Sequence, residues 1–116
     1  MLFGMAKEID LQQILKGLGS DLARNIAISK LVGKIDLPTS QVWRVAAYYE
    51  RARRFYAEAS YAHEVEWKER AKELYRRAVV NYEKVGRFRA AADVALEAGM
   101  IEKTEQLIAL VNLINE

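Results

Sequence analysis

Apolar residues recur every three or four positions along most of the 116-residue chain, and this spacing limits the fold more than any other feature of the sequence. Between Thr39 and Ser60 the apolar stripe is Val42, Val45, Ala46, Tyr49, Ala52, Tyr56 and Ala59. A period of about 3.6 residues is that of an amphipathic helix. Tyr48 and Phe55 fall beside the stripe, so this helix needs neighbours on two sides. We expect both aromatic side chains to pack against a helix that begins at Asp21.

The same spacing predicts five or six helices in one all-α domain. The expected segments are 8–16, 21–32, 39–60, 64–85, 88–98 and 101–115, and Trp67 is expected on the buried side of the fourth. Ser20 is the expected N-cap of the second segment, and Gly33, Gly86 and Gly99 follow helix ends, where glycine favours the left-handed conformation. Within a single domain over 1–116, we expect 1–37 to form short helices and 38–116 to form antiparallel hairpins, either as a repeat array or as a helix bundle.

Composition argues against several classes of protein. The chain is 52% hydrophobic with one proline and six glycines, which is too apolar for disorder and too poor in turn residues for an all-β fold. Cysteine is absent, so we expect no disulfide and no thiolate metal site. No apolar run reaches about 18 residues, and we therefore expect no membrane span and a cytoplasmic protein. A balance rich in Arg and Glu is typical of thermophiles.

The residues that usually carry catalysis or metal binding do not form a recognisable pattern. His63 is the single histidine, and no serine or cysteine arrangement completes a nucleophilic site around it. Glu64, Glu66, Glu69 and Glu73 crowd one segment, but each has Arg or Lys three or four residues further on, as on a solvated helix face. We expect Glu66 to pair with Arg70 and Glu73 to pair with Arg77. No glycine-rich phosphate loop follows a strand. We predict a protein that is not an enzyme and has no catalytic, cofactor-binding or metal-binding residues.

Two stretches of the chain are similar to each other at a period of 26 residues. "YERARRFYAEAS", residues 49–60, aligns with "YRRAVVNYEKVG", residues 75–86, with Tyr on Tyr and Ala on Ala at three positions. Either the two helices are true repeats, or two packed helices have converged on the same stripe. The pattern leaves both interpretations open.

Residues 71–103 resemble a tetratricopeptide repeat. The residues that match the repeat's spacing are Tyr75, Ala78, Val79, Tyr82, Gly86, Phe88, Ala91 and Ala98. Val79, Ala95 and Lys103 stand where the repeat has a small glycine, an aromatic residue and a proline, so the resemblance is to a degenerate hairpin. The string "AKELYRRAVVNYEKVGRF" also resembles the middle of the microtubule-interacting-and-transport domain. Both resemblances imply a non-catalytic protein-protein interaction module, a scaffold or adaptor that binds a peptide or helical segment.

Basic residues interleave with aromatic residues in the two longest expected helices and just after them. The candidates for a basic surface are Arg51, Arg53, Arg76, Arg87 and Arg89. This composition is that of a surface that contacts RNA or phosphopeptides. The alternative is ordinary helix-surface charge, and the net charge of +2 is too small to indicate a nucleic-acid partner by itself.

The alternative function is nucleic-acid binding by a helix-turn-helix over residues 31–45, "LVGKIDLPTSQVWRV". In that interpretation Thr39, Gln41 and Arg44 contact DNA in the major groove. The connection between the two helices is longer than the usual tight turn, and the second helix is expected to continue for more than twenty residues.

The last expected helix is apolar on nearly every side. Leu107, Ile108, Val111 and Ile114 suffice for an inward face, whereas Leu110 and Leu113 fall elsewhere on the helical wheel. We predict that Leu110 and Leu113 form a homodimer contact or a partner contact. The alternative is that Leu2 and Phe3 cover this face within the chain.

Overall fold

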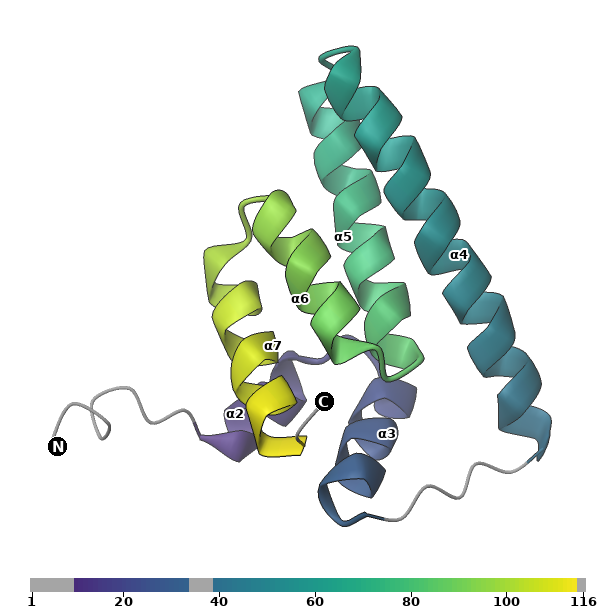
Figure 1. The fold of residues 1–116 in the computed structure, drawn as a ribbon, viewed down its shortest axis with the longest axis vertical. Helices are drawn as coiled ribbons and strands as arrows, with labels where there is room; N and C mark the ends of the chain where they lie inside the picture. Colours follow the sequence, from purple (N-terminus) through teal and green to yellow (C-terminus); the bar gives the residue numbers. More distant parts are fainter. Residues whose placement is uncertain (1–9, 34–38, 115–116) are drawn as a thin grey trace, which may run out of the picture.

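The computed structural model describes residues 10–33 and 39–114, and within these ranges every regular element is a helix. The six helices are α2 (Leu11–Gly17), α3 (Asp21–Leu31), α4 (Thr39–Glu64), α5 (Lys68–Lys84), α6 (Phe88–Glu97) and α7 (Ile101–Ile114). The last four run alternately up and down, with α5 packed against α4 and α6, and α6 packed against α7 (Figure 1). The predicted all-α fold built from helical hairpins is confirmed.

Two of the turns between these helices are centred on the expected glycines. The N–H of Arg87 donates to the carbonyl of Tyr82 (3.0 Å) after α5, and the N–H of Met100 donates to the carbonyl of Ala95 (2.8 Å) after α6. This six-residue bond defines the Schellman motif, which needs a residue with positive φ. Gly86 has φ +73° and Gly99 has φ +77°.

The turn between α4 and α5 has the same geometry without a glycine. The N–H of Trp67 donates to the carbonyl of Ala62 (2.8 Å), and the left-handed residue is Glu66, with φ +63°. A break was predicted between residues 60 and 64, but α4 continues to Glu64 and α5 begins at Lys68, so the turn lies a few residues further along the chain.

The two N-terminal helices belong to the same core as the hairpins. Ile14 of α2 and Ile26 of α3 are buried in one cluster with Phe88 and Leu107. The α3 helix begins as predicted, because the Ser20 hydroxyl accepts a hydrogen bond from the N–H of Ala23 (3.1 Å). The N-terminal third of the described chain is therefore part of the folded unit.

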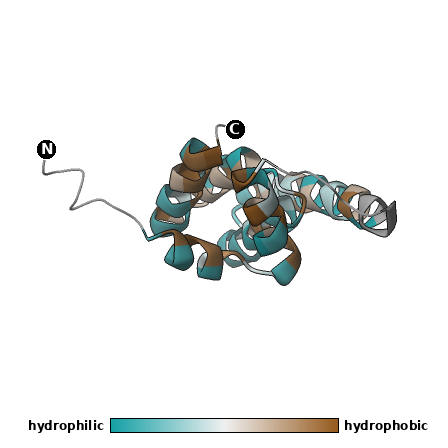
Figure 2. Ribbon diagram, turned by 90° about the horizontal axis from the view of Figure 1, so that it is seen from below, coloured by the Kyte–Doolittle hydropathy of each residue, from teal (hydrophilic) through white to brown (hydrophobic). Residues whose placement is uncertain are grey.

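The α4 helix is the outer member of the array and extends away from the shorter helices (Figure 2). Its aromatic side chains meet cations of α5: the Lys84 ammonium lies 4.6 Å from the centre of the Tyr48 ring, and the Arg77 guanidinium lies 5.8 Å from the centre of the Phe55 ring. The expectation that Tyr48 and Phe55 pack against α3 is wrong, because α3 packs against α2, α5 and α7.

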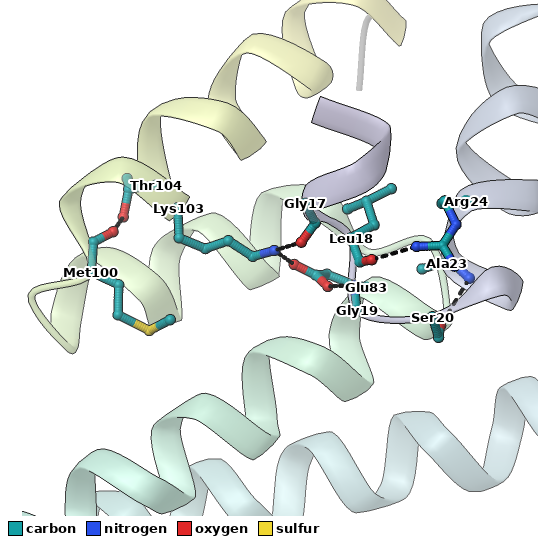
Figure 3. Close-up of polar contacts among 10 residues, drawn as sticks. All are labelled: Gly17, Leu18, Gly19, Ser20, Ala23, Arg24, Glu83, Met100, Lys103 and Thr104. Atoms are coloured by element: carbon teal, nitrogen blue, oxygen red, sulfur yellow. Dashed lines mark hydrogen bonds and ion pairs between the residues drawn. The ribbon is translucent and has the colours of Figure 1, made fainter. Parts of the chain in front are cut away.

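A buried carboxylate joins the N-terminal helices to α5 and α7 (Figure 3). Glu83 of α5 has no exposed surface, and its Oε1 accepts a hydrogen bond from the N–H of Gly19 (3.0 Å). Its Oε2 lies 2.6 Å from the ammonium of Lys103 on α7, which also donates to the carbonyl of Gly17 (2.5 Å). The loop between α2 and α3 is thus held against two other helices.

The orientation of α7 differs from the predicted one. Leu110 is completely buried with Leu107 and Val111, whereas Ile108 is 47% exposed and Leu113 is 53% exposed. The prediction that Leu110 faces a partner is wrong, because α2, α3 and α6 pack against α7 and its core side includes this position. The role of Leu113 in self-association stays a prediction.

Candidate functional site

An apolar groove of about 380 Å³ opens where α4 and α5 meet their turn. Its lining consists of Ala57, Glu58, Tyr61 and Ala62 from α4 and Trp67, Arg70 and Leu74 from the turn and α5. The Tyr61 side chain is 65% exposed and that of Trp67 is 63% exposed. Two large aromatic residues therefore border the groove and remain open to solvent.

The turn itself fixes the position of Trp67. In a Schellman motif, the residue after the left-handed position commonly makes an apolar contact with the residue whose carbonyl accepts the six-residue bond. Here those two residues are Trp67 and Ala62, and both line the groove. Val65 in the same turn is also exposed. Single exposed apolar residues are ordinary, whereas a cluster of them at and beside a groove is typical of a contact surface.

Cations extend from this groove along one side of the hairpin. Arg70, Arg77 and Lys84 stand seven residues apart on α5 and so share one side of that helix. From α4, Arg51 lies 5.4 Å from the centre of the same Tyr48 ring that Lys84 contacts. We call the groove together with Arg51, Arg70, Arg77 and Lys84 the basic face.

The other side of the hairpin is directed toward α6 and is built from tyrosines. Tyr49 and Tyr82 meet edge to face with ring centres 6.2 Å apart, and the centres of Tyr56 and Tyr75 are 6.1 Å apart. The hydroxyl of Tyr56 donates to Oε2 of Glu97 on α6 (2.8 Å). This hydrogen bond is the main reason that the pKa of Tyr56 is raised above its ordinary value, because ionisation would remove the donor beside a carboxylate.

A second pocket, of about 340 Å³, lies on this tyrosine side. Its lining is His63, Lys68, Glu69, Ala71, Lys72, Tyr75, Glu97 and Ala98. The His63 side chain is exposed, and none of the described residues in this lining is a serine or threonine that could act as a nucleophile. Burial is the main reason that the pKa of Tyr75 is raised, which makes this residue a poor base near neutral pH.

The five arginines proposed as a basic surface are exposed but do not gather on one side. Arg51 belongs to the basic face, whereas Arg53 and Arg87 lie over the ring of Tyr49 on the tyrosine side, at 5.8 and 4.8 Å from its centre. Arg76 bonds to Glu73 (2.7 Å), and Arg89 lies on α6.

Sequence reasoning missed the aromatic groove. Trp67 was expected inside the core, and Tyr61 was not singled out; the helix stripe predicts which residues can be buried but not where the partner helix stops covering them. Arg70 was expected to pair with Glu66, and no ion pair joins them within the described part of the chain. The expected pair of Glu73 with Arg77 is present, at 3.0 Å.

The residues of the alternative function are only partly visible. Arg44 is exposed, and the side chains of Thr39 and Gln41 lie outside the described part of the chain. The helices on either side of the proposed turn, α3 and α4, make their main contacts with α5. The alternative therefore stays a prediction.

No protein-family model matches the chain, and no curated protein or solved structure gives a significant match. Among the described residues, no helix has the length and apolarity to cross a membrane. In the same ranges, His, Cys, Asp and Glu side chains form no group of three or more that could hold a metal ion. The features that bear on function are therefore the apolar groove and the cations beside it on the basic face.

Proposed function

We propose that the chain is a non-catalytic protein-protein interaction module that holds a segment of a protein partner in the groove of the basic face. The observation that carries this proposal is the pair of exposed aromatic side chains, Tyr61 and Trp67, at the edges of an apolar groove. Tyrosine and tryptophan dominate binding energy in protein interfaces, where they enclose an apolar side chain of the partner.

The chemistry of the groove favours a protein segment over a small polar metabolite. Pockets for metabolites place several polar groups so that they converge on the ligand. Here the polar side chains in the lining are Glu58, Tyr61, Trp67 and Arg70, and the rest of the lining is alanine and leucine. The exposed surface of the groove is nevertheless mostly apolar, so it suits an apolar side chain of a protein partner.

The resemblance of residues 71–103 to a tetratricopeptide repeat supports the same class of function. Residues 71–103 include all but the first three residues of α5, the turn at Gly86 and the whole of α6. A scaffold or adaptor in the cytoplasm is the role that this resemblance and the cysteine-free sequence favour.

The experiment is a peptide-display selection against the intact protein. Peptides that bind the wild type are counter-selected against the Tyr61→Ala, Trp67→Ala double variant, and the matched control is Ile28→Ala, Val32→Ala, which removes two exposed apolar side chains at the end of α3. We expect to recover peptides that bind the wild type and the control variant but do not bind the Tyr61→Ala, Trp67→Ala variant. Recovery of no peptide that depends on Tyr61 and Trp67 would contradict the proposed function.

A further inference from the structure

We propose that the partner of the basic face is a second copy of this chain, which docks through the outer side of its α6–α7 hairpin. This inference rests on the proposed function and names the occupant of the groove. It follows from a second exposed surface whose apolar residues and charge complement those of the basic face.

The complementary surface lies on the side of α6 and α7 that is turned away from the core. It consists of Asp93 and Leu96 on α6 and Ile101, Glu105 and Ile108 on α7, and we call it the acidic face. Residues three, four or seven apart lie on one side of a helix, and all five side chains are exposed. Asp93 and Ile108 also line one shared pocket between the two helices.

The two faces are arranged in the same order from their turns. On the basic face, Tyr61 and Trp67 lie near the α4–α5 turn, and the cations follow along the helices. On the acidic face, Leu96 and Ile101 flank the α6–α7 turn, and the carboxylates of Asp93 and Glu105 follow. A docked copy can therefore place its apolar side chains in the groove while its carboxylates lie along the cations.

The charges on each face are mostly of one sign. Within the described residues, no carboxylate lies within ion-pair distance of Arg51, Arg70 or Lys84, and Arg77 is paired with Glu73. The acidic residue in the groove lining is Glu58. Arg89 lies beside the acidic face, in the same pocket as Asp93 and Ile108, and has an interaction of its own. Opposite potentials on two surfaces favour their encounter and fix their relative orientation.

The cations are already positioned by aromatic rings of their own hairpin. Lys84 and Arg51 lie over Tyr48, and Arg77 lies over Phe55. A cation held in this way loses less side-chain freedom when a partner docks. The same contacts argue against single-stranded nucleic acid as the occupant, because bases would need those rings as stacking platforms.

The contact is heterologous, since the basic face and the acidic face are different surfaces. A heterologous contact repeats from copy to copy, as a ring if the rotation closes and as an open array if it does not. Helical-repeat proteins usually end in polar capping faces that prevent this growth. Here the basic face and the acidic face each carry exposed apolar side chains, such as Trp67 on the first and Ile101 on the second.

The test combines light scattering with charge reversal. We expect the apparent mass of the wild type to rise with protein concentration and to fall as salt is added, because salt screens the opposite charges. Arg70→Glu with Lys84→Glu makes the basic face acidic, and Asp93→Lys with Glu105→Lys makes the acidic face basic. Each double variant alone should weaken self-association by about tenfold or more.

Mixing the two variants is the decisive measurement. One variant keeps an intact acidic face and the other keeps an intact basic face, so the mixture should form complexes that neither variant forms alone. Lys68→Glu with Lys72→Glu is the matched control: it reverses two charges of α5 on the tyrosine side, and association should be unchanged. Circular dichroism melts show whether each double variant is folded. The mixing result is interpreted only for variants that pass this check, and a variant that fails is replaced by its two single charge reversals.

Several outcomes would overturn the inference. A wild type that stays monomeric at all concentrations would do so, as would an assembly that persists when the basic face is reversed. Binding of single-stranded RNA to the same cations by a monomeric protein would also do so. Groove-dependent peptides recovered with a monomeric wild type would leave the proposed function intact while this inference failed.

Discussion

Lys103 on α7 lies 2.6 Å from Glu83 on α5, a carboxylate with no exposed surface. The same carboxylate accepts the N–H of Gly19, and the same ammonium donates to Gly17. A buried charge is costly unless a partner of opposite charge and hydrogen bonds surround it. This ion pair therefore adds to the apolar core contacts that attach α2 and α3 to the hairpins.

We expect Lys103→Met to lower the free energy of unfolding by about 3 kcal/mol, because it leaves the carboxylate of Glu83 buried without its counter-charge. Adding Glu83→Gln to that variant should recover part of the loss, since the neutral amide can still accept the N–H of Gly19. Urea denaturation measures both variants. A double variant that is less stable than Lys103→Met alone would contradict this account.

The turns show how far the sequence could predict the fold. Gly86 and Gly99 were predicted to end helices, and both have positive φ, because glycine at such a position is a signal that sequence reading can use. Glu66 adopts the same conformation without that signal. Helical periodicity predicts roughly where a helix ends, but it does not show which residue takes the left-handed conformation where no glycine is present.

We predict that Glu66→Gly raises the free energy of unfolding by about 0.5–1 kcal/mol, since glycine removes the steric cost of positive φ. The reverse change can be tested at the two glycines of the equivalent turns, with the variants Gly99→Ala and Gly86→Ala. A Cβ at Gly99 meets nothing within 4 Å, whereas a Cβ at Gly86 lies 2.6 Å from Cγ2 of Ile26. Gly86→Ala should therefore be the more destabilising of the two variants. A melting temperature of Gly99→Ala lower than that of Gly86→Ala would contradict this order.

The candidate site was less predictable than the fold. The aromatic stripe of α4 was recognised from its spacing, but helical spacing does not specify which neighbour covers each residue. Tyr61 and Trp67 are exposed because the turn at Glu66 ends the helix pair beside them. The break was predicted a few residues too early, between residues 60 and 64, and this shift also hid the groove beside the turn.

The orientation of α7 leads to a prediction about two leucines three residues apart. Leu110→Ala should cost about 3 kcal/mol of stability, because its side chain is completely buried, whereas Leu113→Ala should change stability by less than about 0.5 kcal/mol. Chemical denaturation compares them.

For self-association, Leu113→Glu separates two arrangements. A homodimer through α7 would become monomeric, but we expect the concentration-dependent mass in light scattering to remain, since Leu113 lies outside the acidic face. Conversion of the variant to a monomer would favour the α7 homodimer.

The tyrosines between α4, α5 and α6 make stability depend on alkaline pH. The pKa of Tyr56 is raised by its hydrogen bond to Glu97, and the pKa values of Tyr75 and Tyr82 are raised chiefly by burial. A raised pKa in the folded state means that the unfolded chain loses its protons first, near pH 10. The stabilisation is therefore complete below about pH 10 and is lost as the pH rises through the folded pKa values.

We expect the melting temperature to fall above about pH 10, and to fall less steeply in Tyr56→Phe, which has no proton to lose at this position. Tyr61→Phe is the control, because it removes a hydroxyl from an exposed tyrosine on the other side of the hairpin. In a second measurement, Glu97→Gln should lower the pKa of Tyr56 toward its ordinary value, as followed by the ultraviolet absorbance of tyrosinate. Equal alkaline losses in the wild type and Tyr56→Phe would show that the contact with Glu97 does not control this pH dependence.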